Sequence, residues 1–309
     1  MCEIAIFNGF PFHYEMFGYI IYFCYSNKFN LTIYTNFLND NGWLKYYKYI
    51  FEENKKYVFT YKNISDFEKN KYLYDLIILP TDNDYKFNDN NYNINNKTIR
   101  IDHYYVIRRP KIEKFIATRP FLNNYRKWSL PCFPIQEIPK LLTSNIINIT
   151  IVGSTISNYK VDIINRLESL DNKKIRIICI SRKANTNDLK GIDSKFELKI
   201  CKNINTLEMI DILIESNYIL TDVSIGKNYI SDNMSGIIPL SLSLLVPLII
   251  SKNTNKYYQF KNVIEFDENS NESIILKKVN IENLIEERNV MVNTFSNYMF
   301  EYMKDLQKI

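Results

Sequence analysis

The sequence predicts an α/β protein built from two doubly wound domains in tandem. Short apolar runs alternate with longer amphipathic or polar segments along all 309 residues, a pattern that is typical of βα repeats and parallel sheets. The length fits two domains of ordinary size, and a hydrophobic content of 46% can supply two cores. Prolines interrupt the pattern near the middle of the chain and mark a boundary there, at Pro120, Pro131, Pro134 and Pro139.

The apolar runs predict the strands of both halves. In the first half they cover Glu3–Phe7, Leu31–Tyr34, Tyr57–Tyr61, Asp75–Leu79, Thr98–Asp102 and Phe115–Thr118. In the second half they cover Asn148–Val152, Ile175–Ile180, Phe196–Ile200, Tyr218–Asp222, Pro247–Ile250 and Val263–Phe266. An apolar helix is expected over Tyr14–Tyr25, and Ile281–Lys308 has helical periodicity. We therefore expect a first domain at 1–130, a connector at 131–147, a second domain at 148–280, and a C-terminal helix at 281–309 that packs back toward the first domain.

Charge and cysteine content restrict the classes of partner and compartment. The 39 Lys and Arg residues exceed the 34 Asp and Glu residues by a net charge of +5, without a polybasic block. This balance does not suggest nucleic acid as a partner, but it allows attraction of a small anion. The five cysteines are scattered, with no CxxC and no metal-type spacing, so we expect free thiols and a cytoplasmic protein. The apolar run Leu240–Ile250 is too short for a membrane span and contains Pro247.

The segment Asn217–Ser251 predicts a phosphate-binding unit of strand, loop, short helix and strand. Pro239 fits the first turn of a helix, where amides are unpaired in any case, so the helix should begin near Ser235 or Gly236. It should end near Val246, because the residue before a proline is disfavoured in the α region. The free amides and the positive end of the helix dipole then favour an anion in the preceding loop.

Loops that follow strands are the places to search for catalytic groups, because ligands of doubly wound sheets bind beyond the carboxyl ends of the strands. The chain has two histidines, and His13 and His103 both fall in such loops of the first domain. Each is a candidate general base or hydroxyl ligand, although a histidine at a helix start is often a cap or a packing residue. Glu15 is a candidate base or a first-turn carboxylate favoured by the helix dipole.

Further candidates follow other strands. Asp82 and Asp84 form an Asp-Asn-Asp triplet that has the ligands for a divalent cation, although a turn-rich loop produces such triplets by chance. In the second domain, Gly153 and Ser154 offer a small turn with a hydroxyl. No GxGxxG or GxxxxGK[ST] motif accompanies them, which argues against a dinucleotide or P-loop site. The basic pair that follows another strand either binds phosphate or faces solvent, and it comprises Arg182 and Lys183.

The second half resembles the donor-binding domain of GT-B glycosyltransferases. The resemblance lies in the order of parts: Glu208-Met209-Ile210-Asp211 opens a helix, the strand Tyr218–Asp222 follows, and Ser235-Gly236-Ile237-Ile238-Pro239-Leu240 leads through a helix into Val246-Pro247-Leu248-Ile249. It implies two Rossmann-like domains that face a cleft, with the acceptor side at 1–130 and the nucleotide sugar at 148–280. Many retaining members of this family carry two glutamates spaced E-x7-E, and the matching positions here are Asn233 and Ser241.

The resemblance also implies roles for individual residues. Ser235 and Gly236 would supply amides to the donor diphosphate, Ser241 would replace the usual contact to the ribose, and Asp232 would contact the sugar. Helix amides with Arg182 or Lys183 would stabilise the leaving nucleotide diphosphate without a metal or cofactor. The remaining implied role is deprotonation of the acceptor hydroxyl in an inverting reaction, for which the candidates are His13, Glu15, Asp82 and Asp84.

The sequence thus predicts a glycosyltransferase of hexosyltransferase type that uses a nucleotide-diphosphate sugar as co-substrate and a glycan or another hydroxyl compound as acceptor. Two alternatives remain open. A nucleotide-sugar epimerase of the same fold would need several acids and bases near the sugar, and histidines are sparse in this chain. A non-catalytic binding or scaffold protein of the same fold would account for the missing glutamates and glycine motifs.

Overall fold

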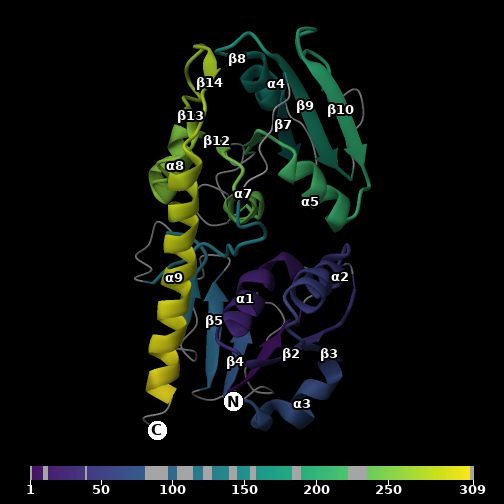
Figure 1. The fold of residues 1–309 in the computed structure, drawn as a ribbon, viewed down its shortest axis with the longest axis vertical. Helices are drawn as coiled ribbons and strands as arrows, with labels where there is room; N and C mark the ends of the chain where they lie inside the picture. Colours follow the sequence, from purple (N-terminus) through teal and green to yellow (C-terminus); the bar gives the residue numbers. More distant parts are fainter. Residues whose placement is uncertain are drawn as a thin grey trace. The chain divides into compact units, whose positions relative to one another are not determined.

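The computed structural model describes residues 2–9, 13–38, 40–80, 97–102, 114–120, 127–138, 145–153, 158–182, 189–221 and 235–306. These residues form two compact units. One contains the described chain up to Phe133 and again from Val290 onward, and the other contains the described chain from Pro134 to Asn289. Each unit is built around a parallel sheet of six strands, and Figure 1 shows the first sheet in purple to blue and the second in teal to yellow-green.

The first unit has the strand order β3-β2-β1-β4-β5-β6. All neighbouring strands pair in parallel, so each strand ends at the same edge of the sheet. The strands are β1 (Glu3–Phe7), β2 (Asn30–Thr35), β3 (Thr60–Asn63), β4 (Leu76–Leu79), β5 (Thr98–Asp102) and β6 (Phe115–Ala117). The helical segments are η1 (Tyr14–Met16), α1 (Gly18–Ser26), α2 (Trp43–Tyr47), η2 (Lys48–Asn54), η3 (Ile64–Asp66), α3 (Phe67–Asn70) and η4 (Lys71–Leu73).

The second unit repeats this topology, with the strand order β10-β9-β7-β11-β12-β13 and parallel pairing throughout. Its strands are β7 (Ile146–Val152), β9 (Lys174–Ser181), β10 (Glu197–Lys202), β11 (Tyr218–Leu220), β12 (Leu248–Ser251) and β13 (Ile264–Phe266). A separate two-stranded sheet joins β8 (Leu167–Ser169) to β14 (Ile274–Leu276). The helices are α4 (Asn158–Asn165), α5 (Thr206–Ile214), α7 (Ile237–Leu244), α8 (Lys252–Tyr258) and α9 (Ile281–Leu306).

The predicted α/β class is confirmed, and both sheets have the 3-2-1-4-5-6 order of a Rossmann fold. The expected strand at Tyr57–Tyr61 instead occupies Thr60–Asn63. The short helix between β11 and β12 begins at Ile237 after Gly236 and ends at Leu244, with Leu245 in the left-handed region. These bounds agree to within two residues with those predicted from Pro239 and Pro247. The small β8–β14 sheet was not predicted.

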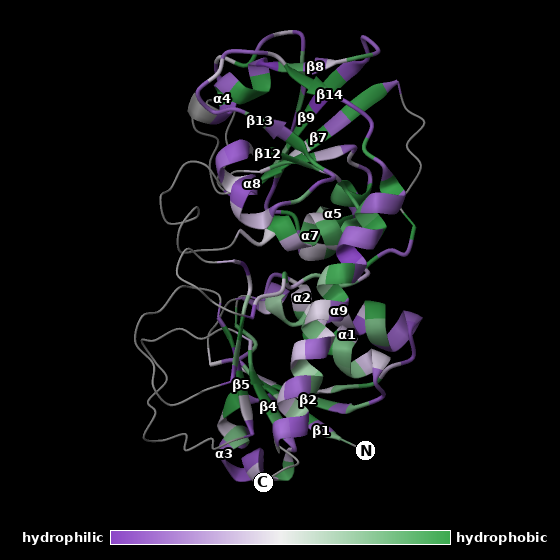
Figure 2. Ribbon diagram, turned by 90° about the vertical axis from the view of Figure 1, so that its left-hand side faces the viewer, coloured by the Kyte–Doolittle hydropathy of each residue, from purple (hydrophilic) through white to green (hydrophobic). Residues whose placement is uncertain are grey.

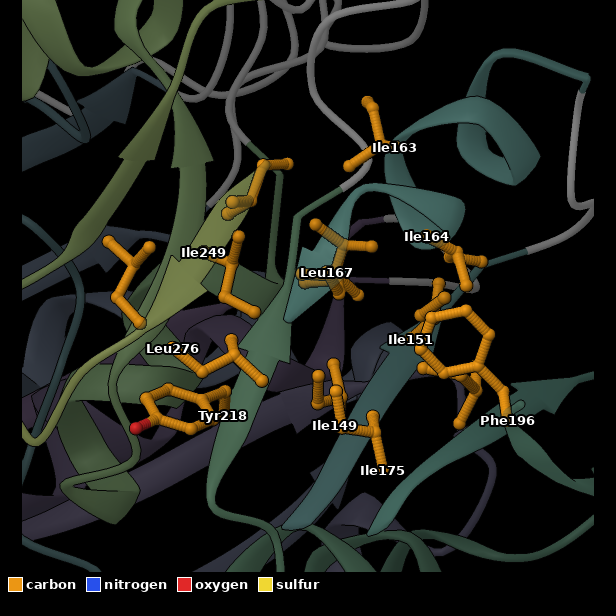
Figure 3. Close-up of a cluster of buried hydrophobic side chains, with 14 of the residues drawn as sticks. Ile149, Ile151, Ile163, Ile164, Leu167, Ile175, Phe196, Tyr218, Ile249 and Leu276 are labelled. Atoms are coloured by element: carbon orange, nitrogen blue, oxygen red, sulfur yellow. The ribbon is translucent and has the colours of Figure 1, made fainter. Parts of the chain in front are cut away.

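Buried side chains cover both faces of the second sheet. On one face, a cluster of buried residues joins the sheet to α4, β8 and β14, and Figure 3 shows its members Ile149, Ile151 and Leu167 among the residues that converge there. On the other face, Ile178 and Ile180 pack with side chains of α5. Because successive side chains of a strand point to opposite faces, a strand covered on both faces is apolar at nearly every position, which is why these strands appear as unbroken apolar runs.

The C-terminal helix α9 contributes residues to both units. Its first turns, up to Asn289, belong to the second unit, and its residues from Val290 belong to the first. In the first unit the ring of Phe295 packs edge to face against that of Tyr19, with 4.6 Å between ring centroids. The Tyr302 hydroxyl donates a hydrogen bond to the Phe115 carbonyl at 2.8 Å. Figure 2 colours this helix in mixed purple, white and green, whereas the central strands are green. None of the helices in the described part of the chain combines the length and apolarity needed to cross a bilayer.

Gly18 at the start of α1 is required by close packing. A Cβ placed there would lie 2.2 Å from Cε1 of Phe133, and the Phe133 ring stacks on Phe51 with 5.8 Å between centroids, so it cannot swing away freely. We predict that Gly18→Ala lowers the stability of the first unit by about 1–3 kcal/mol, because the clash outweighs the helix propensity gained, which is at most about 1 kcal/mol.

Gly9→Ala is the matched control, because a Cβ at Gly9 would have its nearest neighbour, Cε1 of Phe7, at an ordinary 3.7 Å. Thermal and urea unfolding of the two variants gives the comparison. Equal stability of Gly18→Ala and the wild type would show that Phe133 can relax and would contradict the prediction.

Candidate functional site

The strand order places the switch point of the second sheet between β7 and β11. These neighbours pair with Ile219 opposite Thr150. The strand order continues from β7 to β9 and β10 on one side, and from β11 to β12 and β13 on the other. In sheets of this order, ligands bind in the crevice beyond the carboxyl ends of the two switch-point strands. Gly153 follows β7 directly, and its amide donates to the Ile180 carbonyl of β9 at 3.1 Å. Gly153 therefore lies at the carboxyl end of β7, one of the two switch-point strands.

Two helices begin at this edge of the sheet. A helix that connects parallel strands runs back toward their starts, so α4 and α7 both direct their N-termini to the carboxyl ends of the strands. In α7, Ile238 donates its amide to the Ser235 carbonyl at 3.1 Å, and Pro239 has no N–H. No described residue accepts a hydrogen bond from the amides of Ser235, Gly236 or Ile237. These amides, with the helix dipole behind them, form a suitable arrangement for an anion.

A lysine that the sequence analysis did not single out lies in the first turn of α4. Lys160 is only 2% exposed, which is rare for a lysine. Its charge acts on the buried thiol of Cys179: burial raises the pKa of Cys179 to about 12, and Lys160 acts in the opposite direction. The charge of Lys160 therefore lies near Cys179, which stands two residues before the end of β9. The sequence feature that could have identified Lys160 is its position in the helix that follows Gly153.

The structure describes two other predicted residues of this domain, Arg182 and Ser241. Arg182 follows β9 at the same edge and is exposed, so it can reach an anion there. Ser241 is 1% exposed, and its hydroxyl donates to the Val246 carbonyl at 2.8 Å. This bond closes the last turn of α7, so a ribose contact would require that turn to open. Predictions for the remaining donor-side residues lie outside the described residues: Ser154, Lys183, Asp232 and Asn233.

In the first unit, the switch point lies between β1 and β4, which pair with Ile6 opposite Ile78. The loop after β1 leads to His13, which adopts a left-handed backbone conformation with φ 65° and ψ 31°. Such a conformation is uncommon for a residue other than glycine and marks a position worth a functional test. The loop after β4, with Asp82 and Asp84, and the position of His103 lie outside the described residues.

His13 and Glu15 form a pair. The distance from His13 Nδ1 to Glu15 Oε1 is 3.1 Å, and the two side chains are 16% and 32% exposed. When Nδ1–H donates to the carboxylate, Nε2 keeps the lone pair that a general base needs. In the sequence, both residues are separate candidates. The structure brings them together as an imidazole and a carboxylate that contacts its Nδ1.

Two cavities of the second unit lie away from these residues. One of about 570 Å³ is lined by residues of β13 and β14, and another of about 370 Å³ lies at the starts of β7 and β11. Neither includes Gly153, Lys160 or Ser235 among its lining residues. In the described parts of the chain, no group of three or more His, Cys, Asp or Glu side chains has the arrangement of a metal site. The candidate site therefore rests on strand order and charge.

The two-sheet architecture and these edges define the GT-B fold of glycosyltransferases, and solved structures agree. A lipopolysaccharide outer core galactosyltransferase, WaaB, in its apo form is 10% identical with a TM-score of 0.53, and the match covers 97% of this chain and 99% of that one. An alpha-glucosyltransferase in complex with UDP and a 13-mer DNA containing a central A:G mismatch is 14% identical with a TM-score of 0.50, over 98% and 96% of the two chains. No family model matches the sequence, and neither does any curated protein.

Lys160 generates a prediction that does not depend on the identity of a sugar. Lys160→Met keeps the aliphatic stem and removes the charge, so we expect the affinity for pyrophosphate to fall about tenfold or more, the value of one charge-assisted hydrogen bond. Lys199→Met, at an exposed lysine on β10, is the matched control and should bind like the wild type. Isothermal titration calorimetry measures both, and equal affinities would remove Lys160 from the site.

Proposed function

We propose that this protein is a glycosyltransferase that transfers a sugar from a nucleotide-diphosphate donor to an acceptor hydroxyl. The observation that carries the proposal is the buried Lys160 in the first turn of α4, a helix that, like α7, directs its N-terminus to the carboxyl ends of a Rossmann-ordered sheet within a GT-B fold. An anion is the ligand class that this electrostatic arrangement favours. A similar structure, the alpha-glucosyltransferase, is a complex with UDP, which supports a nucleoside diphosphate as that anion.

The donor half of the reaction is assigned to the second unit. As the bond between the sugar and the diphosphate breaks, negative charge accumulates on the leaving phosphate. Amides of Ser235 and Gly236, the dipoles of α4 and α7, and the cations Lys160 and Arg182 stabilise that charge. Fixed donors of this kind are effective because they need no reorganisation during the reaction. The proposal requires no metal and no cofactor other than the nucleotide sugar itself.

The acceptor half is assigned to the first unit. Glu15 holds the His13 ring through Nδ1, and Nε2 takes the proton of the acceptor hydroxyl as that oxygen attacks the anomeric carbon. This is the chemistry of an inverting transfer. A retaining reaction is not favoured, because the position that matches the second family glutamate is Ser241, whose hydroxyl is bonded inside α7.

A non-catalytic binding protein of the same fold is the second candidate, and the same bond of Ser241 favours it, since a contact to the donor ribose is then missing. A thermal-shift panel of UDP, GDP, CMP and TDP sugars, followed by nucleotide release with the best binder, separates the candidates. Binding with release of the nucleotide supports the transferase, and binding without release supports the second candidate. UDP-N-acetylglucosamine that is interconverted without any acceptor would indicate an epimerase instead.

Gly236 tests the donor site. We predict that Gly236→Trp abolishes binding of the nucleotide sugar, because the indole covers the amides at the start of α7, while the protein stays folded since Gly236 is exposed. Gly236→Ala keeps the amide and adds only a methyl group, so it should bind within a few-fold of the wild type. Calorimetric titration together with circular dichroism makes the comparison, and unchanged affinity in Gly236→Trp would refute the assignment.

His13 tests the acceptor half. His13→Asn is preferred to an alanine substitution, because asparagine tolerates the left-handed conformation at this position. We expect unchanged donor affinity and a fall in kcat of about 10²- to 10⁴-fold, the usual contribution of a general base. Turnover and titration of the same preparation provide both numbers. A variant that turns over at the wild-type rate would exclude His13 from the chemistry.

A further inference from the structure

The hydroxyl of Tyr47 contacts the backbone of the turn that carries the His13–Glu15 pair. Tyr47 is the last residue of α2 and is completely buried. Its Oη lies 3.0 Å from the carbonyl oxygen of Tyr14 and 3.0 Å from that of Glu15, and it donates to both. These carbonyls belong to η1, the short helical turn that begins directly after His13. One phenol therefore holds the backbone on which both candidate catalytic side chains depend.

The ring of Tyr47 is itself held firmly. Trp43 stacks on it with 5.6 Å between centroids and 28° between planes, and Phe133 approaches at 6.3 Å. Burial raises the pKa of Tyr47 well above its usual value, and the charge of Glu15 adds to the rise. The hydroxyl consequently stays protonated, and remains a donor, throughout the neutral and moderately alkaline range.

The turn needs this support because it is strained. His13 has a left-handed backbone, a conformation that costs about 1–2 kcal/mol for a residue with a Cβ and that persists only where the surroundings hold it. Tyr14 ties the same turn from the other side, since its hydroxyl donates to Asn36 Oδ1 at 2.9 Å and to the Leu38 carbonyl at 2.6 Å. Tyr14 thus joins the loops after β1 and β2. The buried hydroxyl of Tyr47 adds further hydrogen bonds to the same turn.

We propose that Tyr47 is a positioning residue: its hydroxyl fixes the backbone of Tyr14 and Glu15 and thereby sets the geometry of the His13–Glu15 pair. The role of this pair in transfer rests on the proposed function. Tyr47 is completely buried, so its effect is transmitted through the turn. Small displacements of a catalytic group can cost about 10²-fold in rate, so a single lost hydroxyl at this position should affect the chemical step more than donor binding.

The test uses Tyr47→Phe, which keeps the ring and removes the hydroxyl. Tyr34→Phe is the matched control, because Tyr34 is equally buried and its hydroxyl bonds to that of Tyr74 at 2.7 Å, away from the turn. The substrate is whichever UDP, GDP, CMP or TDP sugar stabilises the wild type most, with nucleotide release as the readout. We expect Tyr47→Phe to lower kcat about 10- to 100-fold and to leave the KM for the donor within about twofold, while Tyr34→Phe keeps both values.

A second readout needs no turnover. The chain has two histidines, so ¹³C-histidine labelling gives two ring signals, and His13→Asn assigns them. Tyr47→Phe should shift or broaden the His13 signal and leave that of His103, whereas Tyr34→Phe should move neither. A wild-type kcat in Tyr47→Phe, or an unmoved His13 signal, overturns the proposal. Absence of donor turnover in the wild type itself would instead overturn the proposed function, and the catalytic role of Tyr47 would fall with it.

Discussion

Parallel strand pairing is the constraint on which the rest of this molecule depends. Because every strand of each six-stranded sheet runs in one direction, the return segments bring helix N-termini to the edge where the strands end. Positive helix ends and post-strand loops therefore gather at one edge without any special sequence motif. This explains how a chain with only seven glycines and no glycine-rich fingerprint forms a candidate phosphate site: the fold supplies the dipoles, and one buried lysine adds a full charge.

The sequence predicted the central strands well because they are covered on both faces, so their apolar runs are continuous. It failed where burial is one-sided or brief. The edge strand β3 has mostly exposed or half-buried side chains. The apolar residues Tyr57 and Phe59 lie just before it, and for this reason the predicted strand began three residues too early. The strands β8 and β14 contain three residues each and carry one exposed central side chain, which is too little for a periodic signal.

The candidate site could be predicted only in part. Gly153, Ser235 and Gly236 follow from strand ends and a proline, which are local features of the chain. Lys160 could not be identified as buried, because lysine is normally a surface residue and its burial here depends on a sheet face assembled from distant segments. The same holds for the left-handed His13 and its partnership with Glu15. A tyrosine more than thirty residues along the chain, Tyr47, donates to the backbone of this turn, a contact that only the folded packing of α2 creates.

The division of α9 between the two units has a consequence for biosynthesis. The segment from Val290 fills the first unit with Phe295 and Met299, which are almost completely buried, and it follows the whole second unit in the chain. Most chains fold their N-terminal domain while the rest is still being made. Here part of the apolar interior of the first unit stays uncovered until the residues of the second unit have been synthesised.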